Sequence, residues 1–337
     1  MNILTLCVEM LVIFIMILCG AWLLRRGILS AESAKAMSYL VAHVCNPALL
    51  LTSAFAYEGK LPPAVFFRGL LVAVGFHAIL IAGGYLINTL LRVKRSERYS
   101  YQLLTVFGNI GFIGIPVCRA VLGPESLVYV SVSCLVFGIL FYTYGTAMIR
   151  NAAQLQHAEQ GTGSTHDAAV SLENGAGAHK ESAVSRILGK LRLIFNIGTL
   201  AAALSIVIYL TDPKVPQLVT ETATHIGNAT VFLSMLVIGC TAASESLREL
   251  FLGGKRIYVF LLLRMLVLPV AIVLLLKLFV HDTLLLGTTA VMVSLPAGSL
   301  SLMLCSEYDL TSQEISRGIL LSTLLCIVTV PIVCSFL

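Results

Sequence analysis

The segment 108–116 reads GNIGFIGIP inside a stretch that is otherwise apolar and long enough to cross a bilayer. Gly108, Gly111 and Pro116 make a poor helix, because glycine costs backbone entropy and proline removes a hydrogen-bond donor. Asn109 stands at this break with an amide that offers both donors and an acceptor. Backbone groups freed at membrane depth must face protein or a wet cavity. Asn109 is therefore the first candidate for contact with a ligand; the alternative is that it only caps the broken backbone.

A second interruption lies far downstream, where 294–301 reads SLPAGSLS. Pro296 breaks the helical pattern, and Ser294 and Ser299 flank it. These hydroxyls either line a pocket or bond their own backbone or a neighbouring helix. Exposed N-terminal ends of half-helices supply N–H groups and positive potential, which suit a carboxylate. Two interrupted helices in matching halves of a chain point to the substrate site of a transporter.

Charged and titratable side chains within apolar segments add further candidates. Arg264 lies in FLLLRMLVLP, and an intramembrane arginine is a functional hypothesis by default. It either binds an organic anion or snorkels toward the inner interface. His43, His77 and His225 could shuttle a proton, since an unperturbed histidine titrates near neutrality. Each of them is more often a packing residue. No Asp or Glu occurs in 63–91, 102–122 or 256–280, which disfavours an ion site built from carboxylates.

Several other kinds of chemistry lack their residues. The sequence has no Walker A motif, no His-Glu-x-x-His and no Gly-x-Ser-x-Gly, which disfavours an ATPase, a zinc protease or an esterase. The nine cysteines all fall in apolar segments, with no Cys-x-x-Cys, and are read as small buried hydrophobes. Basic runs lie at helix ends and are read as topology signals, not as nucleic-acid contacts. We expect no enzyme activity, no metal, no cofactor and no nucleic acid.

Composition identifies the elements that must position these residues. The chain is 58% hydrophobic and 12% charged, with a mean hydropathy of +0.94, whereas soluble domains are about a quarter charged. A membrane-spanning helix needs about 20 apolar residues. On this criterion the sequence predicts an all-α membrane protein with ten transmembrane helices, at 4–24, 32–55, 63–91, 102–122, 125–149, 193–211, 218–242, 256–280, 283–305 and 314–337.

A polar segment rich in small residues, 151–192, follows the fifth predicted helix and is read as a linker. It separates a first five-helix repeat, 1–150, from a second, 193–337. Five is an odd number, so the second half enters the membrane from the opposite face, as an inverted repeat requires. Two pairs of residues at corresponding positions in the two halves give this alignment weak support. They are Asn46 with Asn228, 182 residues apart, and Pro116 with Pro296, 180 residues apart.

The distribution of Lys and Arg predicts the orientation. If the N-terminus lies outside, the inner loops hold 16 of the 22 basic residues and the outer loops hold five, with Arg264 inside the eighth helix. This bias obeys the positive-inside rule. We therefore expect both termini on the outer, periplasmic side and the linker in the cytoplasm.

Four segments of this sequence resemble the auxin efflux carrier family. The resemblance covers nearly the whole chain apart from the linker, and its most specific part is the GNIGFIGIP segment. The segments are NPALL from Asn46 and Pro47, GNIGFIGIP at 108–116, Pro296, and STLL from Ser322 with Pro331. Bacterial members of that family are mostly described as permeases for malate, malonate or related organic acids. The short linker is similar to theirs, whereas plant members often have a longer one.

The resemblance implies a scaffold of helices 1, 2, 6 and 7 and a moving transport domain of helices 3–5 and 8–10. The broken crossover helices 4 and 9 are expected to cross at their prolines and to bind substrate there. Family members carry an acidic residue in helix 3, where this sequence has Gly75-Phe-His-Ala. The predicted substrate-binding residues are Asn109, Gly108, Gly111, Pro116, Asn46, Pro47, Pro296, Ser294, Ser299 and Arg264.

The sequence thus predicts secondary transport of a small organic anion across a bacterial inner membrane by alternating access. The substrate would be a mono- or dicarboxylate such as malate, malonate or an auxin-like acid. Coupling to protons or sodium and assembly as a homodimer are left open. One alternative is a sodium-coupled symporter of the bile-acid type, which has the same fold. The other is a membrane sensor that binds a ligand without transporting it.

Overall fold

A computed structural model describes residues 3–55, 61–159, 197–244, 254–298, 300–301, 305, 310 and 313–337. All the regular elements in this part of the chain are helices, and its one bridge of β type joins Gly108 to Ala297. The first nine residues of the predicted linker, 151–159, continue a helix, and the remainder of the linker lies outside the described residues.

The helices of the N-terminal half form five runs, and three of these runs change helix type along their length. Their elements are α1 (Ile3–Arg25); α2 (Ala31–Leu40), η1 (Val41–Cys45) and α3 (Asn46–Phe55); α4 (Pro63–Leu90); α5 (Arg98–Val106), η2 (Ile110–Gly114) and α6 (Ile115–Leu122); and η3 (Pro124–Ser126), α7 (Leu127–Leu140), η4 (Phe141–Gly145) and α8 (Thr146–Glu159).

The described helices of the C-terminal half are α11 (Ile197–Thr211), α12 (Gln217–Ser244), α14 (Lys255–Leu262), η5 (Leu263–Val267), α15 (Leu268–Lys277), α16 (Thr283–Ser294) and α18 (Gln313–Cys334). Within the described residues, five helical runs are long and apolar enough to cross a membrane: Pro63–Leu90, Pro124–Ala153, Gln217–Ala243, Lys255–Lys277 and Glu314–Cys334. Shorter apolar helices accompany them at Leu11–Arg25, Leu200–Thr211 and Thr283–Ser294. The architecture is that of an all-helical, multi-pass membrane protein.

Local sequence explains where several helices begin and end. The Ser30 side chain caps α2 by accepting from the Ser33 N–H at 3.0 Å, and Asp282 caps α16 by accepting from the Leu284 and Leu285 N–H groups. Pro63 opens α4, where its missing N–H costs nothing. Gly123, with φ of 88°, ends α6 in a conformation that other residues rarely adopt.

Four π-helical segments interrupt the described helices, at η1, η2, η4 and η5. Three of them stand directly before a proline near the start of the next α-helix: Pro47, Pro116 and Pro269. A proline cannot donate to the carbonyl four residues earlier, and its ring clashes with that carbonyl. The wider π turn accommodates both effects. π segments are frequent at functional sites, and these four surround the region described below.

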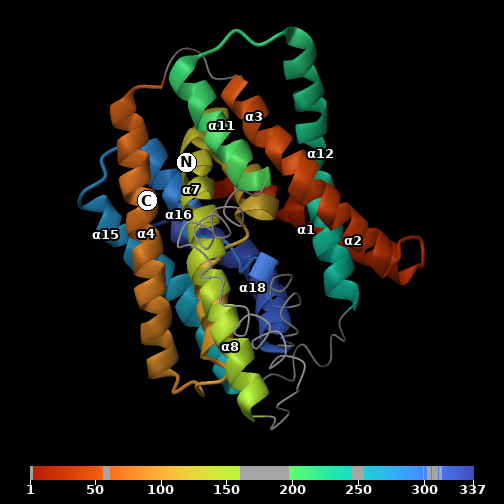
Figure 1. The fold of residues 1–337 in the computed structure, drawn as a ribbon, viewed down its shortest axis with the longest axis vertical. Coiled ribbons are helices and arrows are strands. Elements are labelled where there is room, and N and C mark those ends of the chain that lie inside the picture. The colour runs from red at the N-terminus through yellow and green to blue at the C-terminus, as the bar shows by residue number, and fades with distance from the viewer. Residues whose placement is uncertain are drawn as a thin grey trace, which may run out of the picture.

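Much of the helix packing falls into two groups, which the contact of α11 with α7 joins. In one, α1 packs against α12, and α3 lies against α11 and α12; in the other, α4 packs against α5 and α7, and α16 against α15 and α18. In Figure 1, α4 and α15 run along one side of the molecule, and α2 and α12 along the opposite side. α1 and α12 approach so closely that a Cβ added at Gly20 or Gly239 would collide with the facing backbone. Small residues permit such contacts between membrane helices.

Candidate functional site

The two interrupted segments of the sequence meet in the structure. α5 ends at Val106 and α16 ends at Ser294, and the extended residues that follow pair as a short antiparallel bridge. The Asn109 N–H donates to the Pro296 carbonyl at 2.8 Å, and the Gly298 N–H donates to the Phe107 carbonyl at 2.8 Å. We call this pairing of 107–109 with 296–298 the crossing.

Glycine makes the crossing possible. A Cβ at Gly298 would lie 3.0 Å from the Gly108 oxygen and 3.3 Å from the Phe107 oxygen, both of which belong to the backbone. A Cβ at Gly108 would lie 3.4 Å from the Leu295 Cβ. The crossing includes Pro296 but not Pro116. That proline lies further along the chain in the first turn of α6, where it shapes the π turn before it.

A cavity of about 150 Å³ opens beside the crossing. Four predicted substrate-binding residues line it: Asn46, Gly108, Asn109 and Gly111. Asn109 is 4% exposed, and its carbonyl accepts the N–H groups of Ile113 and Gly114, so it also caps the helical run 110–122. The structure therefore brings residues of the second and fourth predicted helices to one wall of one cavity.

The Asn46 amide is the clearest unused polar group in this wall. Its Oδ1 atom is buried and has no hydrogen-bond partner. The Nδ2 atom lies 2.7 Å from the position that a Cβ on Gly111 would occupy, so a side chain at 111 would displace this amide. Rotation of the amide exchanges its oxygen and nitrogen. Asn46 can therefore present either an acceptor to a protonated acid or donors to a carboxylate.

Other predicted site residues lie outside the cavity lining. Pro47 is buried in α3, behind Asn46. The Ser294 hydroxyl donates to the carbonyls of Ala290 and Val291 in its own helix, at 2.7 and 2.9 Å. Ser299 lies outside the described residues. Ser301 is fully buried, and its hydroxyl has no partner.

Arg264 lies in η5 and is 2% exposed, so it does not snorkel to an interface. Its guanidinium donates three hydrogen bonds to backbone carbonyls: from Nε to Leu104 at 3.2 Å, from Nη1 to Val293 at 3.1 Å and from Nη2 to Leu295 at 3.3 Å. Arg264 is absent from the cavity lining. Direct binding of a substrate anion by Arg264 stays a prediction.

The three membrane histidines occupy different environments. His43 lines the cavity, stacks on Tyr39 with ring centroids 3.9 Å apart, and bonds the Tyr39 carbonyl through Nδ1 at 3.0 Å. His77 is buried in α4 and bonds the Ala73 carbonyl through Nδ1 at 2.8 Å. His225 is exposed on α12. Only His43 is placed to exchange a proton with the contents of the cavity.

Sequence reasoning missed the aromatic wall of the cavity. Phe137, Phe141 and Tyr142 line it from α7 and η4, and the Phe137 and Phe141 rings stack with centroids 5.7 Å apart. Phe107 packs edge-on against both phenylalanines and ties this wall to the crossing. The predicted helix 125–149 is uniformly apolar, so its hydropathy gives no indication of a special face. The aromatic cluster at 137, 141, 142 and 144 was the available signal.

The cavity combines positive backbone potential with neutral side chains. The run 110–122 starts there, and the first N–H groups of a helix carry partial positive charge. Among the lining residues of the described chain, none carries a carboxylate, an ammonium or a guanidinium group. The described residues contain no group of three His, Cys, Asp or Glu that could hold a metal. This arrangement suits one carboxylate attached to an apolar or aromatic body.

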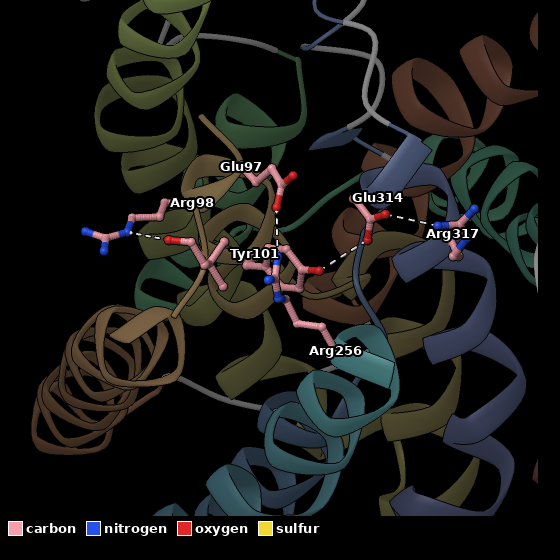
Figure 2. Close-up of polar contacts among 7 residues, drawn as sticks. Glu97, Arg98, Tyr101, Arg256, Glu314 and Arg317 are labelled. Carbon is pink, nitrogen blue, oxygen red and sulfur yellow. Dashed lines mark hydrogen bonds and ion pairs between the residues drawn. The ribbon is translucent and has the colours of Figure 1, made fainter. Parts of the chain in front are cut away.

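A second polar cluster joins the starts of α5, α14 and α18 (Figure 2). Arg256 pairs with Glu97 at 3.1 Å, the Tyr101 hydroxyl donates to Glu314 at 3.2 Å, and Arg317 pairs with Glu314 at 3.0 Å. Figure 2 also shows Arg98 directed away from the other side chains, toward a backbone carbonyl, that of Val93. Of these helices, α5 leads to the crossing, and α14 continues into η5, which carries Arg264.

Comparison with known families agrees with this arrangement. The profile of the family described as Membrane transport protein matches residues 5–334, which includes both interrupted segments and every predicted site residue. A search of curated proteins gave no significant match. The chain belongs to the membrane transport protein family, the auxin efflux carrier family that its interrupted segments resemble.

Proposed function

We propose that this protein is a secondary transporter that moves a small organic anion across the membrane. The observation that carries the proposal is the cavity at the crossing, with the amides of Asn46 and Asn109 on one wall and the start of the run 110–122 opening onto it. Amide donors and helix N-termini recognise carboxylates without a fixed cation. A neutral site of this kind can also release its anion, which transport requires. The transported anion would leave the site chemically unchanged.

The size of the cavity favours a small acid over a bile acid. An engineered protein cavity of about 150 Å³ holds benzene, and the cavity here has about the same volume. Malonate, malate or a compact auxin-like acid is of this scale, whereas a four-ring bile acid is several times larger. The phenylalanine pair on the second wall adds apolar surface, which favours an acid with a hydrophobic body.

We further propose that the chain forms ten transmembrane helices in a five-plus-five inverted repeat. Each interrupted helix has an acidic residue at its N-cap position, which supports this interpretation, although only Asp282 caps through its side chain. Glu97 stands at the N-cap position of α5 and pairs with Arg256, and Asp282 caps α16 and accepts the Tyr129 hydroxyl at 2.7 Å. The packing of α1 and α3 against α12, and of α4 against α5 and α7, supports a division into a scaffold and a transport domain, with α11 in contact with both. Relative motion of the two groups would expose the crossing to each side in turn.

The proposed orientation has a direct test. The positive-inside rule places both termini in the periplasm and the linker in the cytoplasm of a bacterial inner membrane. Reporter fusions at residue 337 and within 160–192 should show opposite sides of the membrane. A cytoplasmic signal from residue 337 would mean that the number of membrane crossings is odd or the orientation reversed.

Flux into proteoliposomes tests the function. Purified protein should transport at least one acid from a panel of labelled malate, malonate, indole-3-acetate and taurocholate. Each acid is measured in sodium or choline medium, with and without a pH gradient. The Asn109→Ala variant should lose most of this flux while the Asn228→Ala variant keeps it. Sodium-dependent uptake of taurocholate would identify a bile-acid-type symporter instead. Binding of an acid without flux would identify a sensor.

A further inference from the structure

The Arg264 guanidinium lies among three backbone carbonyls at the ends of two different helices. Leu104 belongs to the last turn of α5, Val293 belongs to the last turn of α16, and Leu295 directly follows α16. The last four carbonyls of a helix have no intrahelical donor. Each of these oxygens therefore depends on a partner from elsewhere, and Arg264 supplies one donor to each.

Such a cluster of carbonyls is electrostatically a site for a cation. The C-terminal end of a helix carries partial negative charge, and here two such ends converge. In transporters with discontinuous helices, unwound carbonyls and half-helix C-termini are the groups that coordinate the coupling Na⁺ or H⁺. A guanidinium has five donors and no acceptor, and it stays charged in proteins. Its chemistry matches what these carbonyls would otherwise require from a free ion.

We propose that Arg264 is a tethered cation, whose guanidinium permanently fills the carbonyl cluster where a free monovalent cation would otherwise bind. The position then needs no ion from solution. Given the transport function proposed above, the crossing keeps its charge through the cycle without sodium at this position. Among the described residues Arg264 forms no ion pair, so the carbonyls alone offset its charge.

The tethered cation is linked to the cavity through consecutive peptide groups. The Leu295 carbonyl accepts from Arg264, and the next carbonyl, that of Pro296, accepts from the Asn109 N–H. Leu295 and Pro296 are both fully buried or nearly so, and neither peptide can turn without breaking one of these bonds. Arg264 therefore acts as a positioning residue: it fixes the strand of the crossing on which Asn109 depends.

Removing the guanidinium should create a vacant site that free cations can enter. The test uses purified full-length protein in detergent and compares its unfolding temperature in sodium, lithium, potassium and choline chloride at equal ionic strength. The unfolding temperature of wild type should be the same in all four salts. The unfolding temperature of Arg264→Lys should likewise not depend on the salt. Arg264→Ala should unfold several degrees lower in choline and recover in a saturable way with one small cation. This readout needs no substrate, so it stands even if the proposed transport of organic anions fails.

Arg256→Ala is the matched control, because Arg256 lies in the same helical run and makes an exposed ion pair. It should show no selective response to any cation. If Arg264→Ala is too unstable to purify in choline, the yield of folded protein from sodium-containing buffer is the readout. Folded Arg264→Ala without a cation response, the same response in Arg256→Ala, or no rescue of yield by any monovalent cation would each overturn the proposal.

Discussion

Both C-terminal and N-terminal helix ends lie at the crossing, and they differ in the groups that contact them. The C-terminal ends of α5 and α16 meet a buried guanidinium that bonds three of their carbonyls. The N-terminal end of the run 110–122 opens on a cavity whose described lining contains neither an acidic nor a permanently basic side chain. The chain supplies its own countercharge at the negative ends and none at the positive end. The positive end is therefore the one left for an anionic ligand.

This comparison predicts that substitutions of Arg264 and of Asn109 have different effects. The largest expected effect is the loss of stability on substitution of Arg264. Arg264→Met should remove three hydrogen bonds and leave buried carbonyls unpaired, at a cost of about 1–3 kcal/mol for each unsatisfied group. Asn109→Ala should change the unfolding temperature far less, because Asn109 holds the crossing through its backbone. Thermal unfolding of both variants in detergent measures the difference. Equal losses of stability would remove the distinction between the two ends.

The next effect concerns ligand affinity. Asn109→Ala leaves the glycines and prolines of the break intact and removes only the amide. Loss of a hydrogen bond to a charged ligand costs about 1.5–3 kcal/mol, or roughly ten- to a hundredfold in affinity. Binding of the acid identified by the flux panel, measured calorimetrically, should show this loss.

Asn228→Ala is the control for that measurement. Asn228 accepts a hydrogen bond from Arg119 at 3.2 Å, on α12 and away from the cavity lining. Its removal should change ligand affinity little. Weak binding by Asn228→Ala with normal binding by Asn109→Ala would place the site on the other group of helices.

The breaks at the crossing could be predicted from sequence, but their partners could not. Glycine and proline within apolar segments identify 108–116 and 294–301 as interrupted, whatever the rest of the fold does. Which carbonyl pairs with which N–H depends on residues almost two hundred positions apart, such as Asn109 and Pro296. No local propensity encodes that register. Pro296 lies in this pairing and Pro116 lies in α6, and the expectation that the two helices cross at their prolines stays a prediction.

The residues of the candidate site were likewise predicted only in part from the sequence. Gly108, Asn109 and Gly111 were predicted because polar and flexible residues are costly inside a membrane helix, and Asn46 was predicted from the family resemblance. Phe137 of α7 and Phe141 of η4 were not predicted, because an aromatic residue in an apolar helix is compatible with any neighbour. The sequence also showed that Arg264 was unusual without showing its partners. Carbonyls are present at every residue, so only the tertiary structure reveals which of them are free.

The Gly111→Ala substitution tests the N-terminal end of the run 110–122 by adding a single methyl group. The added Cβ would lie 2.7 Å from the Asn46 Nδ2 atom, so the amide must move and the cavity must narrow. We expect a several-fold loss of affinity with little loss of stability, since alanine favours a helix over glycine by about 1 kcal/mol. Gly75→Ala in α4 is the matched control, because nothing lies within 4 Å of its added Cβ. Equal affinities of the two variants would show that Asn46 does not contact the ligand.

The smallest effect is expected at the polar cluster where α5, α14 and α18 begin. The Glu97 and Arg256 side chains are 37% and 40% exposed, and ion pairs exposed to this degree contribute about 0–1 kcal/mol. Glu97→Gln and Arg256→Gln should each lower the unfolding free energy by less than about 1 kcal/mol, with a double-mutant coupling of similar size. Neither should change ligand affinity.

This result would allow a direct comparison of Arg256 with Arg264, because the two arginines lie in one helical run and differ chiefly in burial and partners. A large loss at Arg256 would mean that any arginine in this run is structurally essential, and that the three carbonyls around Arg264 confer no special role.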